Sequence, residues 1–261
     1  MQKTLIDTIP IALPKEIESL VLGAKVYDSS CASGAKVFFI DKDSGYYLKT
    51  DKKGSLEREY LMTSYFHKKG IGAEVLYFGS NECDIMLTAK VQGEDCVNKK
   101  HTDEPKRLSI LQGEELRKLH ELDYSDCPCF NKMEEYVNLA QHNYLTDNFD
   151  KTHFPDNFGY SSAEEAYKVL MNGKGALKSD VLVHGDYCLP NIILKDWKLS
   201  AFIDVGGAGV GDRHIDIFWG LWSLRFNLQT ERYNDLFLDA YGRDKIDKEI
   251  LKIVASAEVF G

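Results

Sequence analysis

One stretch, residues 184–206, constrains the fold and the chemistry of this chain more than any other. Asp186, Asn191 and Asp204 each follow or abut a short apolar run of strand-like composition; the runs are residues 181–183, 192–194 and 201–203. Because the ends of neighbouring strands present their side chains together, we expect these three polar groups to lie close to one another. Carboxylate and amide oxygens are ligands for Mg²⁺, and a carboxylate can orient an attacking hydroxyl group. The stretch therefore predicts a metal and phosphate site.

The spacing of these residues is more specific than their chemistry. His184-Gly185-Asp186 is followed by four residues and then Asn191, and Asp204-Val205-Gly206 comes later. The protein kinases have the same order, with H-R-D, four residues, N and a later D-F-G. The triplet alone would be weak evidence, because Gly and Asp are ordinary turn residues. With both intervals matched, two turns and a polar core residue are the poorer interpretation.

Lys49 lies in an apolar strand pattern, where an unpaired ammonium group would be costly. Tyr47, two residues earlier, is expected on the same face of that strand. A helical pattern follows over residues 55–69, with Glu57 and Glu59 near its start. A strand lysine paired with a glutamate of the next helix is the kinase arrangement for binding the α and β phosphates. Glu59 is the expected partner and Glu57 the alternative; an ordinary edge-strand lysine is the competing interpretation.

The pattern of the chain changes near residue 92. Residues 74–79 and 84–89 continue the series of strands, whereas the chain after residue 105 is helical in pattern. Between them, residues 90–95 are polar and contain a glycine, as a linker would. We therefore expect an α+β protein with an N-terminal lobe, 1–92, and a C-terminal lobe, 93–261. The glycine run 206–211 is interpreted as a flexible segment without a dinucleotide fingerprint, and Asp216 as a structural residue.

Composition limits the partners of the chain. A formal net charge of −9 argues against nucleic acid and suits a cationic small molecule, although solubility alone would also explain it. No apolar run is long enough to cross a membrane. The six cysteines show no paired C-x-x-C spacing, so free thiols in a reducing cytoplasm are the better interpretation and a zinc site the poorer one.

The H-G-D triplet with Ile203-Asp204 resembles the aminoglycoside phosphotransferases, and a similarity to the 3′ type extends from Ser33-Gly34 to the end of the chain. The resemblance implies a two-lobe, protein-kinase-like fold and Mg²⁺-dependent transfer of phosphate from ATP, with GTP left open, to an aminoglycoside hydroxyl. It implies these site residues: Asp186 as catalytic residue; Asn191 and Asp204 as metal ligands; Lys49, Glu59, Ser33, Gly34, Tyr47, Thr88, Ala89 and Val91 at the nucleotide; Glu258 and Phe260 at the substrate.

The chain departs from this family in the residues expected to recognise the acceptor. Phe226 and Asn227 replace an acidic pair that is common in the helix after the metal-binding segment, and Gly207 replaces an arginine. Gly261 follows the acidic and aromatic tail, and would displace the terminal carboxylate from the site.

Three interpretations follow from these departures. The first is an aminoglycoside kinase of altered specificity that uses Glu258 and acids of the loop 147–156. The second is a kinase for another hydroxylated small molecule, such as a sugar, an amino alcohol or a macrolide. The third, a non-catalytic nucleotide-binding module, is disfavoured because all five central residues are present, namely Lys49, Glu59, Asp186, Asn191 and Asp204.

Overall fold

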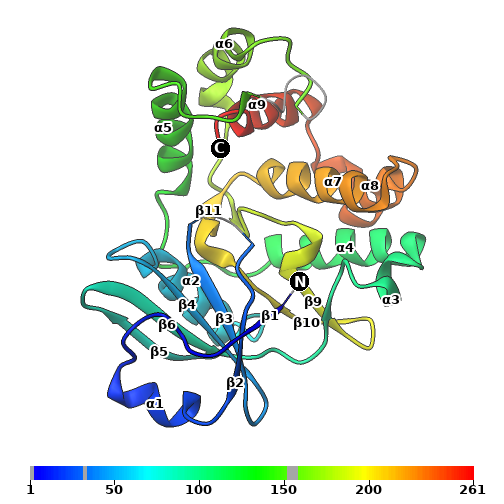
Figure 1. Ribbon diagram of the computed structural model, residues 1–261. Coiled ribbons are helices and arrows are strands. Elements are labelled where there is room, and N and C mark those ends of the chain that lie inside the picture. The colour runs from blue at the N-terminus through cyan, green and yellow to red at the C-terminus, as the bar shows by residue number, and fades with distance from the viewer. Residues whose placement is uncertain (1–2, 32–33, 152–157) are drawn as a thin grey trace. The chain divides into compact units, whose positions relative to one another are not determined.

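The computed structural model describes residues 3–31, 34–151 and 158–261 (Figure 1). The chain divides into two compact units. The sheet unit comprises Met1–Gly93 and Ile193–Gly206, and the helical unit comprises Glu94–Ile192 and Gly207–Gly261. The predicted α+β class is confirmed. The predicted lobes 1–92 and 93–261 stay a prediction, since the sheet unit also takes in a later segment of the chain.

The sheet unit is built on a six-stranded antiparallel sheet of order β1-β2-β3-β4-β6-β5. Its elements are β1 (Thr4–Ile6), α1 (Lys15–Val21), β2 (Lys25–Asp28), β3 (Lys36–Asp41), β4 (Tyr46–Lys52), α2 (Glu57–Lys68), β5 (Val75–Ser80), β6 (Cys83–Ala89), β9 (Ile192–Lys195), β10 (Lys198–Phe202) and, at its end, η4 (Val205–Gly207).

The two faces of this sheet differ because side chains alternate along each strand. One face packs with α1 into an apolar core that includes Phe38, Ile40, Leu48 and Leu87. The opposite face carries Lys49 and the residues that share its side of β4. One face of the sheet is therefore buried in the apolar core, and the other face carries the charged side chain of Lys49.

Helix α2 is held at its start by Asp84, a fully buried residue of β6. The Asp84 carboxylate accepts hydrogen bonds from the backbone amides of Gly54 at 2.9 Å and Leu56 at 2.8 Å. Leu56, the N-cap residue, makes no side-chain capping hydrogen bond of its own. Asp84 thus fixes the end of α2 that carries the two candidate glutamates.

Strands β9 and β10 form a hairpin whose two-residue turn has positive φ at Asp196 and Trp197, 52° and 61°. Positive φ at both central residues is the requirement of a type I′ turn. Phe202, at the end of β10, bridges in parallel to Gly72 and packs its ring against Phe66 of α2, with centroids 6.3 Å apart. These contacts bring the segment after β10 to the region of α2, far away in sequence.

The helical unit contains most of the helices (Figure 1). Its elements are β7 (Glu94–Asp95), α3 (Lys99–Thr102), α4 (Pro105–His120), α5 (Lys132–Leu145), α6 (Ala163–Gly173), η2 (Lys174–Ala176), β8 (Val181–Val183), η3 (Leu189–Asn191), β11 (Gly209–Gly211), α7 (His214–Leu228), α8 (Asn234–Tyr241), η5 (Arg243–Lys245) and α9 (Lys248–Glu258).

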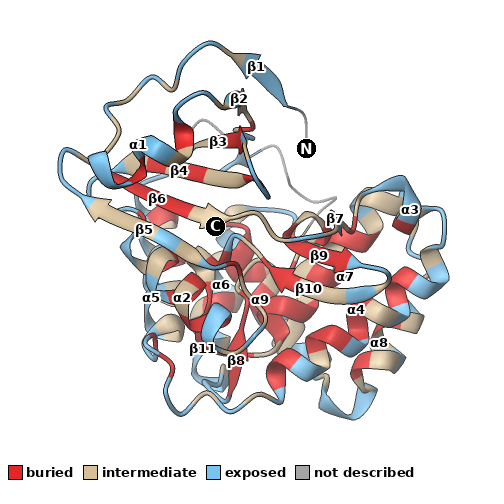
Figure 2. Cartoon of the chain, turned by 90° about the horizontal axis from the view of Figure 1, so that it is seen from below, coloured by how far each residue is buried: buried red, intermediate tan, exposed pale blue. Residues whose placement is uncertain are grey.

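Within the helical unit, α4 packs on α8, and α9 packs on α6 and α7. Figure 2 shows the buried residues of this unit along α4 and α7. The glycine run predicted to be flexible is ordered instead, because β11 pairs with β8 and the Val210 amide donates to the Cys129 carbonyl at 2.8 Å. That prediction was wrong. Across the described ranges, no helix combines the length and the apolar character needed to span a membrane.

Candidate active site

The sheet unit brings Lys49, Glu59 and Asp204 together. The Lys49 ammonium lies 2.8 and 2.7 Å from the two carboxylate oxygens of Glu59 and 2.8 Å from Oδ1 of Asp204. Lys49 comes from β4, Glu59 from the first turn of α2, and Asp204 from the segment after β10. The predicted pairing of Lys49 with Glu59 is confirmed, and the alternative partner Glu57 is not used in this way.

The charges of this triad are partly shielded from solvent. The side chains of Lys49 and Glu59 are 19% and 11% exposed, whereas that of Asp204 is 53% exposed. Burial alone would lower the pKa of Lys49, but the carboxylates of Asp204 and Glu59 outweigh it and raise that pKa. Burial raises the pKa of Glu59 more than the Lys49 charge lowers it. Lys49 therefore stays a cation, and the more exposed Asp204 keeps Oδ2 available to a ligand.

Asp204 has a backbone φ of 58°, in the left-handed region that non-glycine residues seldom occupy. Such a conformation persists only where the surrounding structure imposes it, and it is common at functional sites. Phe202, packed against Phe66, lies two residues before Asp204. Gly206 lies two residues after it, where an added Cβ would contact the Glu59 side chain at 3.4 Å. The backbone bend is what turns the Asp204 carboxylate toward Lys49.

The predicted nucleotide residues of β4 and β6 lie beside the triad. Tyr47 shares the face of Lys49, and its ring centroid lies 5.2 Å from that of Phe39. Thr88 is the direct cross-strand partner of Tyr47. The Ala89 amide already donates to the Glu74 carbonyl at 2.9 Å, so a nucleotide contact by Ala89 would use its carbonyl.

The other predicted nucleotide residues are less informative. Val91 follows β6 and is half-buried, and Gly34 is exposed just before β3. Ser33 lies outside the described residues.

The helical unit holds the H-G-D triplet by its backbone. The amides of His184 and Gly185 donate to the two carboxylate oxygens of Asp216 at 2.7 and 2.8 Å. His120 Nε2 lies 3.0 Å from Asp216, and its Nδ1 lies 2.9 Å from the Tyr241 hydroxyl. Since a carboxylate only accepts, Nε2 carries the proton and Nδ1 accepts from Tyr241. Asp216 is structural, as predicted, but it holds the loop after β8 instead of capping its own helix.

Gly185 is required by the local geometry. Its φ is +84°, and a Cβ at this position would lie 2.1 Å from the Gly207 carbonyl oxygen. A side chain, such as the arginine of the kinase triplet, would collide with the backbone there. The H-G-D form of the triplet is thus explained by the close contact of Gly185 with Gly207, the last residue of η4.

Asp186 and Asn191 are joined by the loop that separates them. The Asn191 side-chain amide donates to Oδ2 of Asp186 at 2.9 Å and to the Asp186 carbonyl at 3.0 Å. Both amide hydrogens are used on this side, so the amide oxygen of Asn191 points elsewhere and can serve as a ligand. The loop is held further by the Leu189 amide, which donates to Ser223 Oγ of α7 at 2.9 Å.

Glu258, the residue near the C-terminal end that is predicted to bind the phosphate-accepting substrate, also lies in the helical unit. Tyr136 of α5 donates its hydroxyl hydrogen to the Glu258 carboxylate at 2.7 Å, and the Trp219 indole donates to it as well. Burial raises the pKa of Glu258 to about 7; the Asp186 charge adds to the rise, against the hydrogen bonds and the charge of Lys132. The charge of Asp186 therefore acts on the buried Glu258 carboxyl group.

Phe260, the other residue predicted at the substrate, has its ring buried in the protein core. It is fully buried, in edge contact with Tyr144, Phe149 and Tyr167, and its carbonyl accepts from Asn143 at 2.7 Å. The structure places Phe260 in the core that supports the tail. Its predicted role at the substrate stays a prediction, and any role would be indirect.

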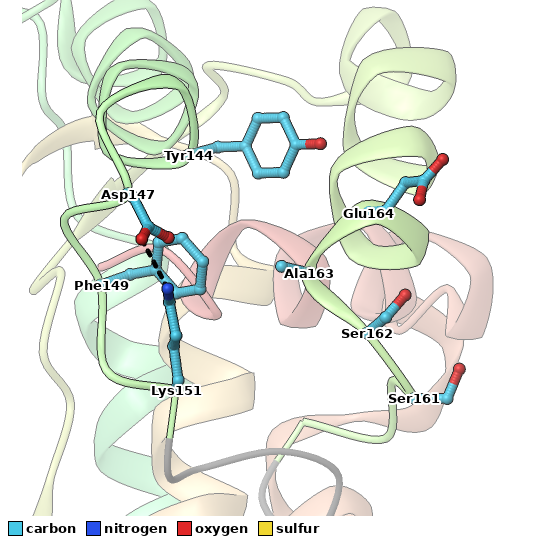
Figure 3. Close-up of a pocket in the computed structure, with 8 residues that line it drawn as sticks. All are labelled: Tyr144, Asp147, Phe149, Lys151, Ser161, Ser162, Ala163 and Glu164. Atoms are coloured by element: carbon cyan, nitrogen blue, oxygen red, sulfur yellow. Dashed lines mark hydrogen bonds and ion pairs between the residues drawn. The ribbon is translucent and has the colours of Figure 1, made fainter.

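The replaced acidic pair and the 147–156 loop have distinct surroundings. Phe226 is 57% exposed, whereas the Asn227 side chain turns back to donate to Ser223. Part of the loop lines a hollow of about 450 Å³ with the start of α6, where Asp147 is paired with Lys151 (Figure 3). Of the loop's acids, Asp156 lies outside the described residues. The hollow contains none of the phosphoryl-transfer residues named above.

The donor set is compatible with Mg²⁺. Among the residues that the structure describes, no group of three or more His, Cys, Asp or Glu side chains forms a metal site. Mg²⁺ is usually bound through one or two protein oxygens with substrate phosphates and water completing its octahedron. Asn191 in the helical unit and Asp204 in the sheet unit each offer one such oxygen, so both residues fit that role.

Comparison with known proteins identifies the family. The model of the phosphotransferase enzyme family matches residues 28–251, more than half of the chain. The chain is 47% identical over 249 residues to a protein of Lactococcus lactis subsp. lactis (strain IL1403) named "Probable aminoglycoside 3'-phosphotransferase", with 95% of each protein covered. It is 32% identical over 231 residues to the aminoglycoside 3'-phosphotransferase of Enterococcus faecalis, with 83% of this chain and 86% of the relative covered.

Solved structures agree on the fold. The crystal structure of aminoglycoside-3'-phosphotransferase of type VIII superimposes with a TM-score of 0.79 at 22% identity, covering 94% of this chain and 98% of the other. At that identity the likeness establishes the fold alone, which is the predicted protein-kinase-like one. The chain therefore belongs to the phosphotransferase enzyme family, among the aminoglycoside phosphotransferases, and is itself a phosphotransferase.

Proposed function

We propose that this protein transfers the γ-phosphate of ATP, with Mg²⁺, to a hydroxyl group of an aminoglycoside, the 3′-hydroxyl in the first instance. The names of the relatives at 47% and 32% identity support the acceptor class. The observation that carries the proposal is the Asp186–Asn191 pair, held by Asp216 through the backbone of the H-G-D triplet. Phosphoryl transfer demands such fixed oxygen groups more than any covalent chemistry by the protein.

Asp186 is the proposed catalytic residue. It would accept a hydrogen bond from the acceptor hydroxyl and orient it for in-line attack on the γ-phosphorus. An aspartate is a weak base at its reference pKa, so orientation contributes more than early removal of the proton. As the new P–O bond forms and the bond from the γ-phosphorus to the departing ADP breaks, the proton of the acceptor hydroxyl passes to the Asp186 carboxylate, one oxygen of which already accepts from Asn191.

The proposed nucleotide residues belong to the sheet unit. Lys49, oriented by both oxygens of Glu59, would donate to the α and β phosphates. Tyr47 would stack on the purine, with Thr88, Ala89 and Val91 along the purine edge and the Ser33-Gly34 turn at the phosphates. One solved protein of this fold is in complex with ADP and streptomycin, which is consistent with nucleotide use here. GTP as donor stays an alternative.

Asn191 and Asp204 are the proposed ligands of Mg²⁺. The metal, when bound, neutralises charge that develops on the phosphate oxygens during transfer. The salt bridge between Lys49 and Asp204 at 2.8 Å supports the assignment, because Lys49 then orients the carboxylate that would bind the metal.

Glu258 is the proposed acceptor residue. The charge of Asp186 acts on its carboxyl group, and we infer that an ammonium group bound to Glu258 would lie on the same side as the hydroxyl that Asp186 orients. The net charge of −9 favours a cationic acceptor as well. A kinase of another hydroxylated small molecule is the second candidate, and the exposed Phe226 in place of a carboxylate favours it.

The test is Mg²⁺-dependent release of ADP from ATP by the purified protein, with kanamycin, neomycin and a panel of neutral sugars, amino alcohols and macrolides as acceptors. We expect turnover on kanamycin or neomycin that Asp186→Ala abolishes. Turnover on another acceptor alone would replace the first candidate by the second. Binding of ATP without turnover on any acceptor would overturn both and leave a nucleotide-binding module.

A further inference from the structure

Three aromatic side chains cross the face of the sheet that carries Lys49. We name them the aromatic strip: Tyr27 of β2, Phe39 of β3 and Tyr47 of β4. Tyr27 is the direct cross-strand partner of Phe39, which is in turn the partner of Tyr47, so the three side chains lie on one face. The ring centroids are 6.1 Å apart for the first pair and 5.2 Å apart for the second. The strip extends from the tyrosine proposed to stack on the purine toward β1 at the edge of the sheet.

Lys3 reaches this strip from the segment before β1. Leu5 of β1 is the cross-strand partner of Tyr27, and Lys3 lies two residues before Leu5, so the alternation of side chains puts both on that face. The Lys3 ammonium nitrogen lies 3.3 Å from the ring centroid of Phe39 and 5.4 Å from that of Tyr47. The face of an aromatic ring attracts a cation over such distances. Lys3 is therefore held over Phe39 and beside Tyr47.

The Phe39 ring is fixed from its other neighbours. Lys90, which follows β6, places its ammonium group 5.6 Å from the Phe39 centroid, and its backbone amide donates to the Gly45 carbonyl at 3.0 Å. Gly45 leaves room for this packing, because an added Cβ would lie 2.9 Å from Cδ of Lys90 and 3.0 Å from the Phe39 ring. Phe39 itself is only 7% exposed. Two ammonium groups thus converge on one well-packed ring.

The charge of Lys3 is not fully compensated at this position. Lys3 is exposed as a whole residue, but burial of its ammonium end lowers its pKa. The charge of Lys90 lowers that pKa further, and the carboxylate of Asp41 offsets only part of the change. An ammonium group that has lost water and lies near a like charge is stabilised by an acceptor atom. A bound molecule with a lone pair beside Phe39 would supply one.

A base stacked on Tyr47 would bring such an atom to Lys3. Stacked rings lie about 3.5 Å apart, and the Lys3 nitrogen lies over Phe39 and not over Tyr47. The base would therefore cover the Tyr47 ring and have Lys3 beside its edge. Purine edges carry ring nitrogens that accept hydrogen bonds. Because Lys49 is assigned to the phosphates, the two lysines would bind different parts of the nucleotide.

We propose that Lys3 is a further nucleotide-binding residue, which donates a hydrogen bond to the edge of the purine base stacked on Tyr47. The Phe39 ring holds the ammonium group in place before the nucleotide binds. This inference rests on the proposed function, since it requires the purine on Tyr47. It gives the segment before β1 a part in binding the base and no part in the transfer of phosphate.

The first experiment measures the Kd of ATP with Mg²⁺ by calorimetry. Loss of one hydrogen bond from a charged donor in Lys3→Ala should raise Kd about fivefold to tenfold. Lys3→Arg keeps a cation that donates and that stacks on aromatic rings, so it should recover most of the loss. Lys15→Ala is the matched control, because Lys15 is an exposed lysine at the start of α1 in the same unit. It should change Kd less than about twofold. Unchanged or tighter binding of ATP by Lys3→Ala would overturn the inference.

A second comparison separates the base from the phosphates. Adenosine carries the base without phosphates, and tripolyphosphate carries phosphates without a base. We expect Lys3→Ala to weaken the binding of adenosine by the same factor as that of ATP, and to leave the binding of tripolyphosphate unchanged. An equal loss for tripolyphosphate would show that Lys3 attracts the charge of the phosphates, and the proposed contact with the base would be wrong.

Kinetic measurements separate this inference from the proposed function. With kanamycin as acceptor, Lys3→Ala should raise KM for ATP about fivefold to tenfold and leave kcat and KM for kanamycin unchanged. Binding of ATP that depends on Lys3, without turnover on any acceptor, would overturn the proposed function and keep the inference. Turnover with an unchanged KM for ATP would keep the proposed function and overturn the inference. A wild-type protein that binds neither ATP nor adenosine would overturn both.

Discussion

The H-G-D loop, residues 184–191, and the aromatic row of α7, formed by Trp219, Trp222 and Phe226, both depend on that helix, yet they are constrained in different ways. Asp216 and Ser223 of α7 hold the loop through the backbone amides of three of its residues. The aromatic row of α7 is held by ring contacts between its side chains and by the hydrogen bond from the Trp219 indole to Glu258. A hydrogen bond to a backbone amide fails with any loss of its acceptor, whereas a stacking surface tolerates change of size and shape. Substitutions on the other side of α7 can therefore alter the binding of the phosphate acceptor without disturbing the hydrogen bonds that hold the loop.

The largest expected effect is on the loop side. Asp186→Asn should lower kcat about 10³-fold or more, because the acceptor hydroxyl loses the group that orients it and takes its proton. The substituted side chain keeps nearly the same shape, so the melting temperature should stay within a few degrees of the wild type. Measurement of kcat by ADP release, with a thermal melt as control, tests this expectation. Activity above a tenth of the wild-type value would contradict the role of Asp186.

Replacement of Asp216 should have the next largest effect, mainly as a decrease in the free energy of unfolding. Asp216→Ala leaves the buried amides of His184 and Gly185 and the ring of His120 without their acceptor. We expect the free energy of unfolding in urea to fall by about 3 kcal/mol. Asp244→Ala is the control, since Asp244 is an exposed residue that pairs with Lys245 at the surface, and its loss should cost less than about 0.5 kcal/mol. Similar losses in the two variants would show that the loop does not depend on Asp216.

The sequence predicts the loop side better than the acceptor side, for a physical reason. A residue that contributes a side-chain oxygen or an ammonium group to a site must be of a particular type. It must also stand at a particular distance along the sequence from the other residues of the site. The pairing of Lys49 with Glu59 is visible in the sequence for that reason and is confirmed at 2.7 Å. The roles of Lys49, Glu59, Asp186, Asn191 and Asp204 toward nucleotide, metal and acceptor stay predictions.

Support by backbone amides leaves no such pattern. Asp84 and Asp216 each accept from amides about 30 residues away, and nothing in the sequence marks those amides as their partners. The flexibility predicted for the glycine run 206–211 is wrong, because glycine confers freedom only where tertiary contacts do not impose a conformation. The contact of Gly185 with Gly207 and the pairing of β11 with β8 impose it here. Phe260 was placed at the substrate, but its aromatic neighbours bury it.

The pH dependence of KM tests whether the Glu258 carboxyl group binds the phosphate-accepting substrate. Tyr136, Trp219, Lys132 and Asp186 surround this carboxyl group, and its pKa of about 7 means that it is mainly neutral at pH 6 and mainly ionised at pH 8. Affinity for a cationic acceptor should therefore rise with pH, by about tenfold in 1/KM between pH 6 and pH 8. The same upward shift makes the contribution of Glu258 to stability fall as pH rises from about 4.5 to about 7.

Glu258→Gln is the control for that titration. It removes the ionisation of the protein but keeps that of the amino groups of the acceptor. In this variant we expect KM to lose its decrease between pH 6 and pH 8 and to keep the dependence that comes from the acceptor. An unchanged pH profile would assign the whole effect to the acceptor and remove Glu258 from the site.

The smallest expected effect sharpens the boundary between the loop and the aromatic row. Asn227 directly follows Phe226, but its side-chain amide donates to the Ser223 carbonyl at 2.8 Å and to Ser223 Oγ at 3.2 Å. Ser223 Oγ in turn accepts from the Leu189 amide of the H-G-D loop. Asn227 is thus part of the support of the loop, although a carboxylate at its position would belong to the recognition of the acceptor in the resembling enzymes.

Asn227→Ala should therefore reduce the free energy of unfolding by about 1 kcal/mol and change kcat/KM less than about twofold for every acceptor. The neighbouring Phe226→Ala should do the opposite, with little loss of stability and a larger change in kcat/KM, because Phe226 is exposed. Urea denaturation and kcat/KM for kanamycin, measured on both variants, give four numbers that test the division. If Asn227→Ala lowered kcat/KM more than Phe226→Ala, Asn227 would face the acceptor, and the loop and the aromatic row would be one continuous surface of α7.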